Sequence, residues 1–495
     1  MENKIGFDSE KYLKLQNKKI RERIAKFGGK LYMEFGGKLF DDFHASRVLP
    51  GYNPNNKIKL LESLKDDAEI IFCISATDIE KNKIRADFGI TYDMEVLRLI
   101  DSLRKIGLKI NSVVITLFTG QPAAIKFKNK LERHNEKVYI HIPTKGYPTD
   151  VETIVSDEGY GKNPYIETTR SLIVVAAPGP GSGKLGTCLS QLYHEFKRGN
   201  KVGYAKFETF PVWNLPLKHP VNIAYEAATS DLKDVNMLDS YHLEAHNEIA
   251  VNYNRDLEVF PVVKEILKKI TGEDIYKSPT DMGVNMIGYC ISDDEACKEA
   301  SKQEIIRRFY RQRADYKRGR SSFDAVERIQ LLMNELSISS SDRACVQPAI
   351  DKEKASHCPC VSIQLKDGRI IVGRNTDILT ASASALLNAI KVLANIDDKL
   401  KIISPNILLP ILEMKEKLMG REKGNLTLKD VLIALAISAK DNDIIRNAYE
   451  KIALLQGCEA HSTHLLHQTN EETFRQLKIN ITCGDKFLSE NLYDA

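Results

Sequence analysis

Short apolar runs alternate with longer amphipathic stretches in the first half of the chain. Apolar spacing typical of helices fills several of the intervals, for example at 92–106 and 185–198. This alternation predicts a three-layer α/β domain over residues 1–228, with helices on both faces of a mostly parallel sheet. The strands are predicted in five runs that are rich in β-branched and aromatic residues: 69–75, 112–118, 137–142, 171–177 and 201–207.

The pattern changes in the middle of the chain. Between 229 and 336, strand-like runs almost vanish and Leu and Ile recur at helical spacing among charged residues, which predicts a helical domain. A polar break at 337–342 suits a linker. Alternating elements then return, so residues 343–495 are predicted to form a C-terminal α/β subdomain.

That subdomain opens with a hairpin signature, in which two apolar runs meet at the Asp367-Gly368 turn. An Ala- and Leu-rich helix is predicted at 382–394, followed by a short strand at 400–403 and further helices.

The most informative motif follows the apolar run 171–177. It reads Pro178-Gly-Pro-Gly-Ser-Gly-Lys184 and leads directly into sequence that is compatible with a helix. Backbone N–H groups can surround an anion where side chains are small, and the helix N-terminus and the lysine add positive charge. We therefore expect a phosphate-binding loop between a strand and a helix. Its predicted phosphate-binding residues are Gly179, Gly181, Ser182, Gly183, Lys184 and Thr187.

Two positions depart from the phosphate loop of nucleoside triphosphatases, G-x-x-x-x-G-K-[ST]. Pro178 replaces the first glycine, and Leu185 replaces the hydroxyl residue that holds magnesium. Thr187 is the candidate to supply that hydroxyl. Phosphate binding is therefore predicted more directly than ATP hydrolysis, and a Gly-Pro turn that only joins strand to helix is the alternative.

Two other clusters carry candidate chemistry. Asp157 and Glu158 stand in a glycine-punctuated loop and could hold a metal or act as a general base, unless they form an acidic surface turn. Lys38 and Arg47 suit an anionic substrate, and His44 between them is a candidate acid or base; a solvated charge cluster is the alternative. With Lys184, we predict Asp157, Glu158 and His44 as catalytic residues.

The metal-binding residue types give a weaker pattern. His242 and His246 stand one helical turn apart, but no third ligand is evident in sequence. His357-Cys-Pro-Cys360 lacks a second cysteine pair. We therefore predict no convincing zinc site, and the identity of any metal stays open.

Composition narrows the class of protein. A net charge of +4 over 495 residues makes nucleic acid an unlikely partner, although the basic stretch 307–320 could contact RNA or a second subunit. No window approaches the ~20 apolar residues of a membrane helix, and the polar start does not resemble a signal peptide. Nine scattered cysteines suit reduced thiols. We expect a cytoplasmic protein with no membrane association.

Four long segments resemble one family. MEFGGKLFDDFHASRVLPG (33–51), TKGYPTDVETIVSDEGYGKNPYIET (144–168), APGPGSGKLGTCLSQLYHE (177–195) and AATSDLKDVNMLDSYHLEAH (227–246) are similar to the domain-of-unknown-function family 1846, uncharacterised bacterial proteins about as long as this chain. The resemblance implies an α/β N-terminal region, a helical middle and a C-terminal α/β subdomain with cytidine-deaminase-like topology.

The deaminase chemistry itself is not expected. Residues 380–384 contain no His or Cys followed by the catalytic Glu, and no P-C-x-x-C follows. The resemblance therefore concerns the fold of the subdomain and not its activity.

The sequence leads to three functional hypotheses. The first is an enzyme, a phosphate-loop-like transferase or nucleoside triphosphatase, that binds ATP, another nucleotide or a phosphorylated metabolite at 179–184 and transfers a phosphoryl or nucleotidyl group to a small anionic substrate, with Mg²⁺. The second is a sugar-phosphate or phosphorylated-cofactor enzyme that does not use ATP. The third is a non-catalytic regulatory assembly. We expect a homo-oligomer.

Overall fold

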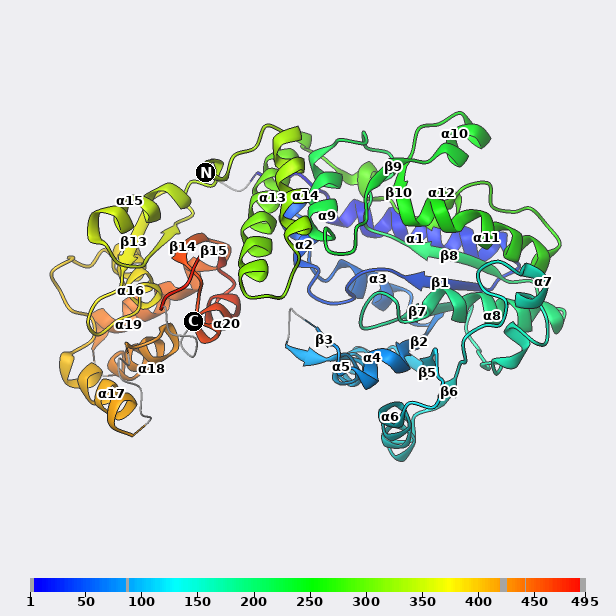
Figure 1. Cartoon of the computed structure of the whole chain (residues 1–495), viewed down its shortest axis with the longest axis horizontal. Helices are drawn as coiled ribbons and strands as arrows, with labels where there is room; N and C mark the ends of the chain where they lie inside the picture. The colour runs from blue at the N-terminus through cyan, green and yellow to red at the C-terminus, as the bar shows by residue number, and fades with distance from the viewer. Residues whose placement is uncertain (1–3, 86–88, 419–424, 441, 490–495) are drawn as a thin grey trace. The chain divides into compact units, whose positions relative to one another are not determined.

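The computed structural model of the chain describes residues 4–85, 89–418, 425–440 and 442–489 (Figure 1). The chain divides into two compact units. Residues 5–226 and 233–301 form one, which we call the sheet unit, and the other consists chiefly of residues 302–495. None of the helices in the described ranges combines the length and the apolar character that crossing a bilayer requires.

The sheet unit is built on one seven-stranded sheet with the order β11-β8-β1-β7-β2-β5-β6, and every pair of neighbours is parallel. The α/β class and the large parallel sheet are therefore confirmed. All five predicted strands are present, whereas β1 and β11 had not been predicted. The strands are β1 (Leu31–Phe35), β2 (Ala68–Ser75), β5 (Lys109–Thr116), β6 (Val138–Ile140), β7 (Leu172–Ala176), β8 (Gly203–Phe207) and β11 (Gly283–Val284).

Helices cover both faces of this sheet. The connections from β1 to β2, β5 and β6 progress toward one edge, whereas those from β7 to β8 and β11 progress toward the other. Right-handed crossovers that run in opposite directions lie on opposite faces. Accordingly, α1 packs with α3, and α8 packs with α11. The main helices that connect or flank these strands are α1 (Ser9–Lys26), α3 (Asn56–Ser63), α5 (Tyr92–Lys105), α6 (Pro122–Arg133), α8 (Lys184–Lys197) and α11 (Asn254–Thr271).

Residues 229–336 are mostly helical but also contain strands. A hairpin of β9 (Asn236–Leu238) and β10 (Val251–Tyr253) encloses α10 (Ser240–His246), and β11 completes the large sheet. The longest described helices of this region are α13 (Asp294–Lys317) and α11, and α14 (Phe323–Glu335) follows α13. The division into domains at 228 and 336 stays a prediction.

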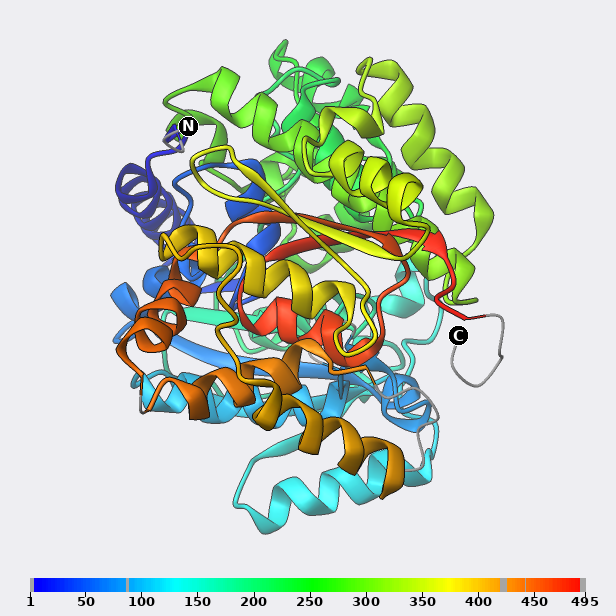
Figure 2. The same ribbon diagram turned by 90° about the vertical axis from the view of Figure 1, so that its left-hand side faces the viewer.

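The C-terminal unit holds a four-stranded sheet of order β13-β12-β14-β15 (yellow to red in Figure 2). β12 (Cys360–Gln364) is antiparallel to β13 (Ile370–Arg374) and to β14 (Glu459–His464), while β15 (Asn480–Lys486) is parallel to β14. The predicted hairpin is present.

The helix predicted after the hairpin is also confirmed, as α16 (Ala381–Leu393). The strand predicted at 400–403 is wrong. Ile402 and Ile403 belong to an irregular segment and are buried in the core of the unit. Such a short apolar run therefore indicated burial but not a strand.

A close approach in the core gives a stability test. A Cβ atom added at Gly203 in β8 would lie 2.1–2.7 Å from atoms of Phe27, including its Cβ, so the ring cannot simply turn away. We expect Gly203→Ala to lower the free energy of unfolding by about 1–3 kcal/mol, measured by denaturant titration. Gly186→Ala, at a helical position with open space around it, is the matched control and should be neutral or stabilising. Equal effects of the two substitutions would contradict this packing.

Candidate functional site

The loop 177–183 lies at the carboxyl edge of the large sheet. It leaves β7 after Ala176 and enters α8 at Lys184, and β7 has β1 on one side and β2 on the other. The connections that follow β1 and β7 leave in opposite directions along the sheet. In parallel α/β sheets such a divergence opens a crevice beyond the strand ends, and this is where ligands bind.

Hydrogen bonds within the loop fix its shape. Gly181 and Gly183 adopt φ of +74° and +79°, on either side of Ser182. The buried Ser182 hydroxyl donates to the Gly179 carbonyl at 2.9 Å, and the Thr116 hydroxyl donates to the Ser182 carbonyl at 2.9 Å. Among the described residues, no backbone carbonyl accepts from the N–H groups of Gly181 and Gly183. The loop is therefore ordered while these donors stay available.

Two glycines of the loop lie against side chains of neighbouring elements. A Cβ at Gly179 would be 2.3 Å from the Tyr92 hydroxyl oxygen at the start of α5. A Cβ at Gly183 would be 2.7 Å from Oγ1 of Thr116 at the end of β5. A side chain at position 179 would thus displace the Tyr92 ring, and one at position 183 would meet both Thr116 and an unfavourable left-handed φ.

Lys184 forms an ion pair with a residue of the neighbouring strand β1. Its Nζ lies 3.6 Å from Oε1 of Glu34 in β1, and both side chains are 13% exposed. Oε2 of Glu34 accepts a hydrogen bond from the Tyr204 hydroxyl at 3.0 Å. At this separation the attraction between the charges is about 4 kcal/mol before desolvation is subtracted. The pair holds the ammonium group at the start of α8, beside the loop.

A second charged cluster lies beside this pair, at the end of β8. Lys206 forms ion pairs with Glu208, at 2.6 Å, and with Asp256 at the start of α11. Burial acts to lower the pKa of Lys206, but Asp256, Glu208 and Glu34 outweigh it and raise that pKa. Burial, with the charge of Asp256, raises the pKa of Glu208 against the opposing effect of Lys206. The neighbouring carboxylates therefore interact with one another.

A third pair lies under the segment that follows β1. The buried Lys57 ammonium is 3.1 Å from Oδ2 of Asp42 and donates to the Gly36 carbonyl at 3.2 Å. Burial acts to raise the pKa of Asp42, but the charges of Lys57 and His44 outweigh it, so the pKa lies below its usual value. His44 itself lies edge-on to the rings of Phe210 and Tyr225, each 5.3 Å away between ring centroids.

Asp157 and Glu158 lie at the opposite end of α8 from the loop. Asp157 accepts from the Tyr193 hydroxyl at 2.9 Å and pairs with Lys197, the last residue of the helix. Thirteen helical steps separate Lys197 from Lys184, which corresponds to about 20 Å. Glu158 is 61% exposed and pairs with Lys145 and Lys162. These two carboxylates are therefore not brought to the loop.

The remaining predicted residues divide between surface and interior. Thr187 is buried, and its hydroxyl accepts from the thiol of Cys73 in β2 at 3.4 Å, so it points into the core. Lys38 is exposed and Arg47 is half-buried, in the segment between β1 and α3. Of the predicted set, the structure gathers the loop residues and Lys184, with His44 near the Lys57–Asp42 pair.

The basic stretch on α13 is largely paired within its own unit. Arg307 forms ion pairs with Glu304 and Glu459, and Arg313 forms one with Asp485. Acidic partners therefore contact these two guanidinium groups.

Sequence reasoning missed most of the charged residues that flank the loop. No motif surrounds Lys57, Lys206 or Glu208. Glu34 opens the glycine-rich segment Glu34-Phe-Gly-Gly-Lys38 but was not predicted as a site residue. The position of Lys206 and Glu208 in the sequence was one available signal. Lys206 lies near the end of the predicted strand 201–207 and Glu208 directly follows it, and the carboxyl ends of parallel strands meet at one edge. Asp256 lies about 50 residues further along the chain and had no such signal.

Comparison with known proteins identifies the family of the chain. The N-terminal and C-terminal parts of the domain of unknown function DUF1846 match residues 5–337 and 341–493. The chain is 57% identical to a UPF0371 protein of Clostridium tetani (strain Massachusetts / E88) over 499 residues, and 58% identical to one of Clostridium botulinum (strain Langeland / NCTC 10281 / Type F). In each case the alignment covers 99% of both chains.

The buried Lys57–Asp42 pair predicts a pH-dependent effect. Lys57→Met leaves the Asp42 carboxylate buried without its counter-charge, and we expect a loss of about 3–5 kcal/mol in the free energy of unfolding at pH 7. Because the pKa of Asp42 is lowered in the folded protein, its stabilising contribution is present above the unfolded pKa of about 3.9 and is lost as the pH falls through the folded pKa.

The difference between wild type and Lys57→Met should therefore shrink as the pH is lowered from 7 to 4 and below, in denaturant titrations. Lys59→Met, at an exposed position of the same helix, is the control and should change stability by less than about 0.5 kcal/mol. A difference that does not depend on pH would contradict the role of the Asp42 charge.

Proposed function

The chain belongs to the DUF1846 family, and we propose that it is an enzyme that binds the phosphate group of a nucleotide or another phosphorylated metabolite at the loop 177–183. One observation carries the proposal. A glycine loop with available N–H groups and a lysine at the start of α8 lies at the crevice of a parallel sheet, between β1 and β7. Backbone donors, the helix N-terminus and the ammonium group all favour an anion there.

The charges around the loop favour a phosphate that arrives with a cation. Three lysines near the carboxyl edge face four carboxylates: Lys57, Lys184 and Lys206 against Glu34, Asp42, Glu208 and Asp256. An added phosphate increases the negative charge and competes with Glu34 for Lys184. A divalent cation held between the phosphate and a carboxylate would restore the balance, and hard oxygen ligands suit Mg²⁺. We therefore propose a magnesium nucleotide as the first ligand class.

The chemistry we propose is phosphoryl or nucleotidyl transfer to a small anionic substrate. Lys184 would stabilise the charge that builds on the transferred group, and the N–H groups of Gly181 and Gly183 would contact its oxygens. Glu34 and Glu208 replace Asp157 and Glu158 as the carboxylates of the proposed site, because Glu34 contacts Lys184 and Glu208 follows β8 at the same edge of the sheet. His44 with Lys38 and Arg47 stays the proposed substrate side, on the segment after β1.

For the C-terminal unit we propose a fold and no activity. The order and directions of its four strands, with β12 antiparallel to its neighbours, support the cytidine-deaminase-like topology that the family resemblance implies. Thr380 caps α16 where a deaminase has a zinc ligand and its glutamate, so we assign no deaminase activity to it.

Two alternatives to this proposal remain. In one, Pro178 and Leu185 mark a loop adapted to a sugar phosphate or a phosphorylated cofactor, and the enzyme does not use ATP. In the other, the chain is a non-catalytic, oligomeric regulatory protein. The first retains the anion site at Lys184, and the second does not need it.

Substitutions of the Lys184–Glu34 pair test the anion site. We expect Lys184→Ala to weaken binding of ATP–Mg²⁺ about 30-fold, corresponding to a lost charge-assisted contact of about 2 kcal/mol, measured by isothermal titration calorimetry. Glu34→Gln should act in the opposite direction on inorganic pyrophosphate without metal, because Lys184 is then released from its carboxylate. Gln keeps an oxygen to accept from Tyr204.

Lys197→Ala, at the other end of the same helix, is the control and should bind like wild type. Unchanged affinity in Lys184→Ala, with the fold retained by circular dichroism, would sink the assignment of the loop as an anion site.

A thermal-shift panel separates the ligand classes. A ligand at 100 times its Kd stabilises the folded state by about 2.7 kcal/mol, which raises the midpoint measurably. We expect nucleoside triphosphates to raise the midpoint with Mg²⁺ and much less with EDTA. Stabilisation by sugar phosphates in the presence of EDTA would favour the first alternative, and no shift with any phosphate would favour the regulatory one.

A further inference from the structure

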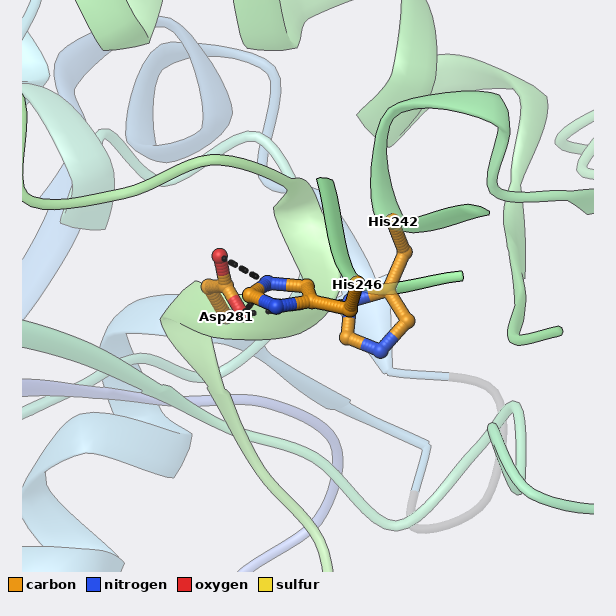
Figure 3. A group of neighbouring side chains, drawn as sticks. All are labelled: His242, His246 and Asp281. Carbon is orange, nitrogen blue, oxygen red and sulfur yellow. Dashed lines mark hydrogen bonds and ion pairs between the residues drawn. The ribbon is translucent and has the colours of Figure 1, made fainter. Parts of the chain in front are cut away.

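Three potential metal ligands from two separate elements converge in the sheet unit (Figure 3). His242 and His246 stand on α10, and Asp281 stands on α12 (Pro279–Met282). Nε2 of His246 lies 3.0 and 3.1 Å from the two carboxylate oxygens of Asp281, and Nδ1 of His242 lies 3.8 Å from Oδ1. One ligand atom of each residue lies within 4.8 Å of the others.

This donor set is chemically specific. Two imidazole nitrogens and one carboxylate oxygen are ligands that zinc and the neighbouring divalent transition metals prefer, whereas Mg²⁺ and Ca²⁺ prefer oxygen alone. The spacing of four residues places both imidazoles on one face of α10, and the two rings lie 4.6 Å apart between centroids. Small side-chain rotations would bring all three atoms to one ion.

Surrounding hydrogen bonds already orient the three side chains. Asp239 caps α10 through the His242 N–H and also accepts from the Thr280 hydroxyl, at 2.6 Å, so it ties α10 to α12. The Lys277 N–H donates to Oδ2 of Asp281 at 2.9 Å. Such second contacts, which hold ligands in place before an ion binds, are a regular part of metal sites.

The environment of His242 supports a metal on its Nδ1. His242 is 6% exposed, and its Nε2 is a buried nitrogen with no hydrogen-bond partner in the described part of the chain. With the proton on Nε2, the lone pair of Nδ1 faces Asp281 and the ion. Oε2 of Glu248 lies 3.9 Å from Nε2, and after a small movement it could accept a hydrogen bond from the Nε2–H group. Ser278, now 2.9 Å from Nδ1, would turn aside.

The site is open on one side. The side chain of His246 is 37% exposed and that of Asp281 is 23% exposed, so an ion can enter from solvent. Three protein ligands leave a fourth tetrahedral position for water, as in reactive zinc sites and unlike closed structural ones.

We propose that His242, His246 and Asp281 form a binding site for a divalent transition-metal ion of the zinc type, with the fourth position taken by water. Asp281 is separated from His246 by 35 residues, which is why the two histidines alone looked incomplete in sequence. The site uses none of the residues of the phosphate proposal and stands independently of it.

The single tryptophan of the chain provides a local readout. The ring of Trp213 lies edge-on to His242, with 6.1 Å between centroids. We expect Co²⁺ added to the EDTA-treated, dialysed full chain to quench Trp213 fluorescence at one equivalent, with a visible ligand-field band, and Zn²⁺ to reverse the quenching. Elemental analysis of the zinc-loaded chain after gel filtration should give one zinc per chain.

Matched variants decide the assignment. His246→Gln and Asp281→Asn should each weaken Co²⁺ binding at least about 100-fold, the upper end of the range typical of residues that only contact a ligand. His134→Gln, an exposed histidine at the end of α6, is the control and should bind like wild type.

Asn at position 281 keeps an acceptor for the Lys277 N–H, and unchanged circular dichroism spectra would show that loss of binding is not loss of fold. The proposal is overturned if wild type neither retains zinc nor shows quenching, or if His246→Gln and Asp281→Asn quench like the His134→Gln control.

Discussion

The common direction of the seven strands is the constraint on which the candidate site depends. Because every strand is parallel to its neighbours, all carboxyl ends meet at one edge, and segments distant in sequence deliver their next residues to that edge. The glycine loop after β7, Glu34 in β1 and Lys206 with Glu208 at the end of β8 come together for this reason alone. A single antiparallel strand at the centre would have sent one of these groups to the opposite edge.

The second organising feature is that the lysines of this edge already have carboxylate partners. Lys184, Lys206 and Lys57 are each bound to at least one carboxylate before any ligand arrives. Partly buried charges are stable only when they are compensated, so the ion pairs keep the crevice folded. The same pairing makes ligand binding an exchange, in which an anion takes the place of a carboxylate or is bridged to it by a cation. A site of this kind discriminates by charge as well as by shape.

The sequence predicted what depends on local pattern. Buried apolar runs predicted β2, β5, β6, β7 and β8, and the glycines with Lys184 predicted the strand–loop–helix unit. β1 was missed because Leu31–Phe35 is short, contains Glu34 and lies between glycine pairs, so its pattern resembles a loop. Asp157 and Glu158 were grouped with the loop because glycine-rich acidic segments are typical of sites, but nothing local reports which end of α8 they contact. Asp281, the third residue of the proposed metal site, could not be found, since only tertiary structure brings it to His246.

The contact between Gly179 and Tyr92 has an evolutionary consequence. The phenol ring fills the space that any side chain at position 179 would need, so neither position can change alone without cost. A substitution of Gly179 is best tolerated after Tyr92 has been replaced by a smaller residue, and that first replacement on its own leaves a gap beside the loop. Related chains that lack Gly179 should therefore lack Tyr92 as well. Correlated substitution at these positions in related sequences would reflect a contact between a helix start and a loop that lie 87 residues apart.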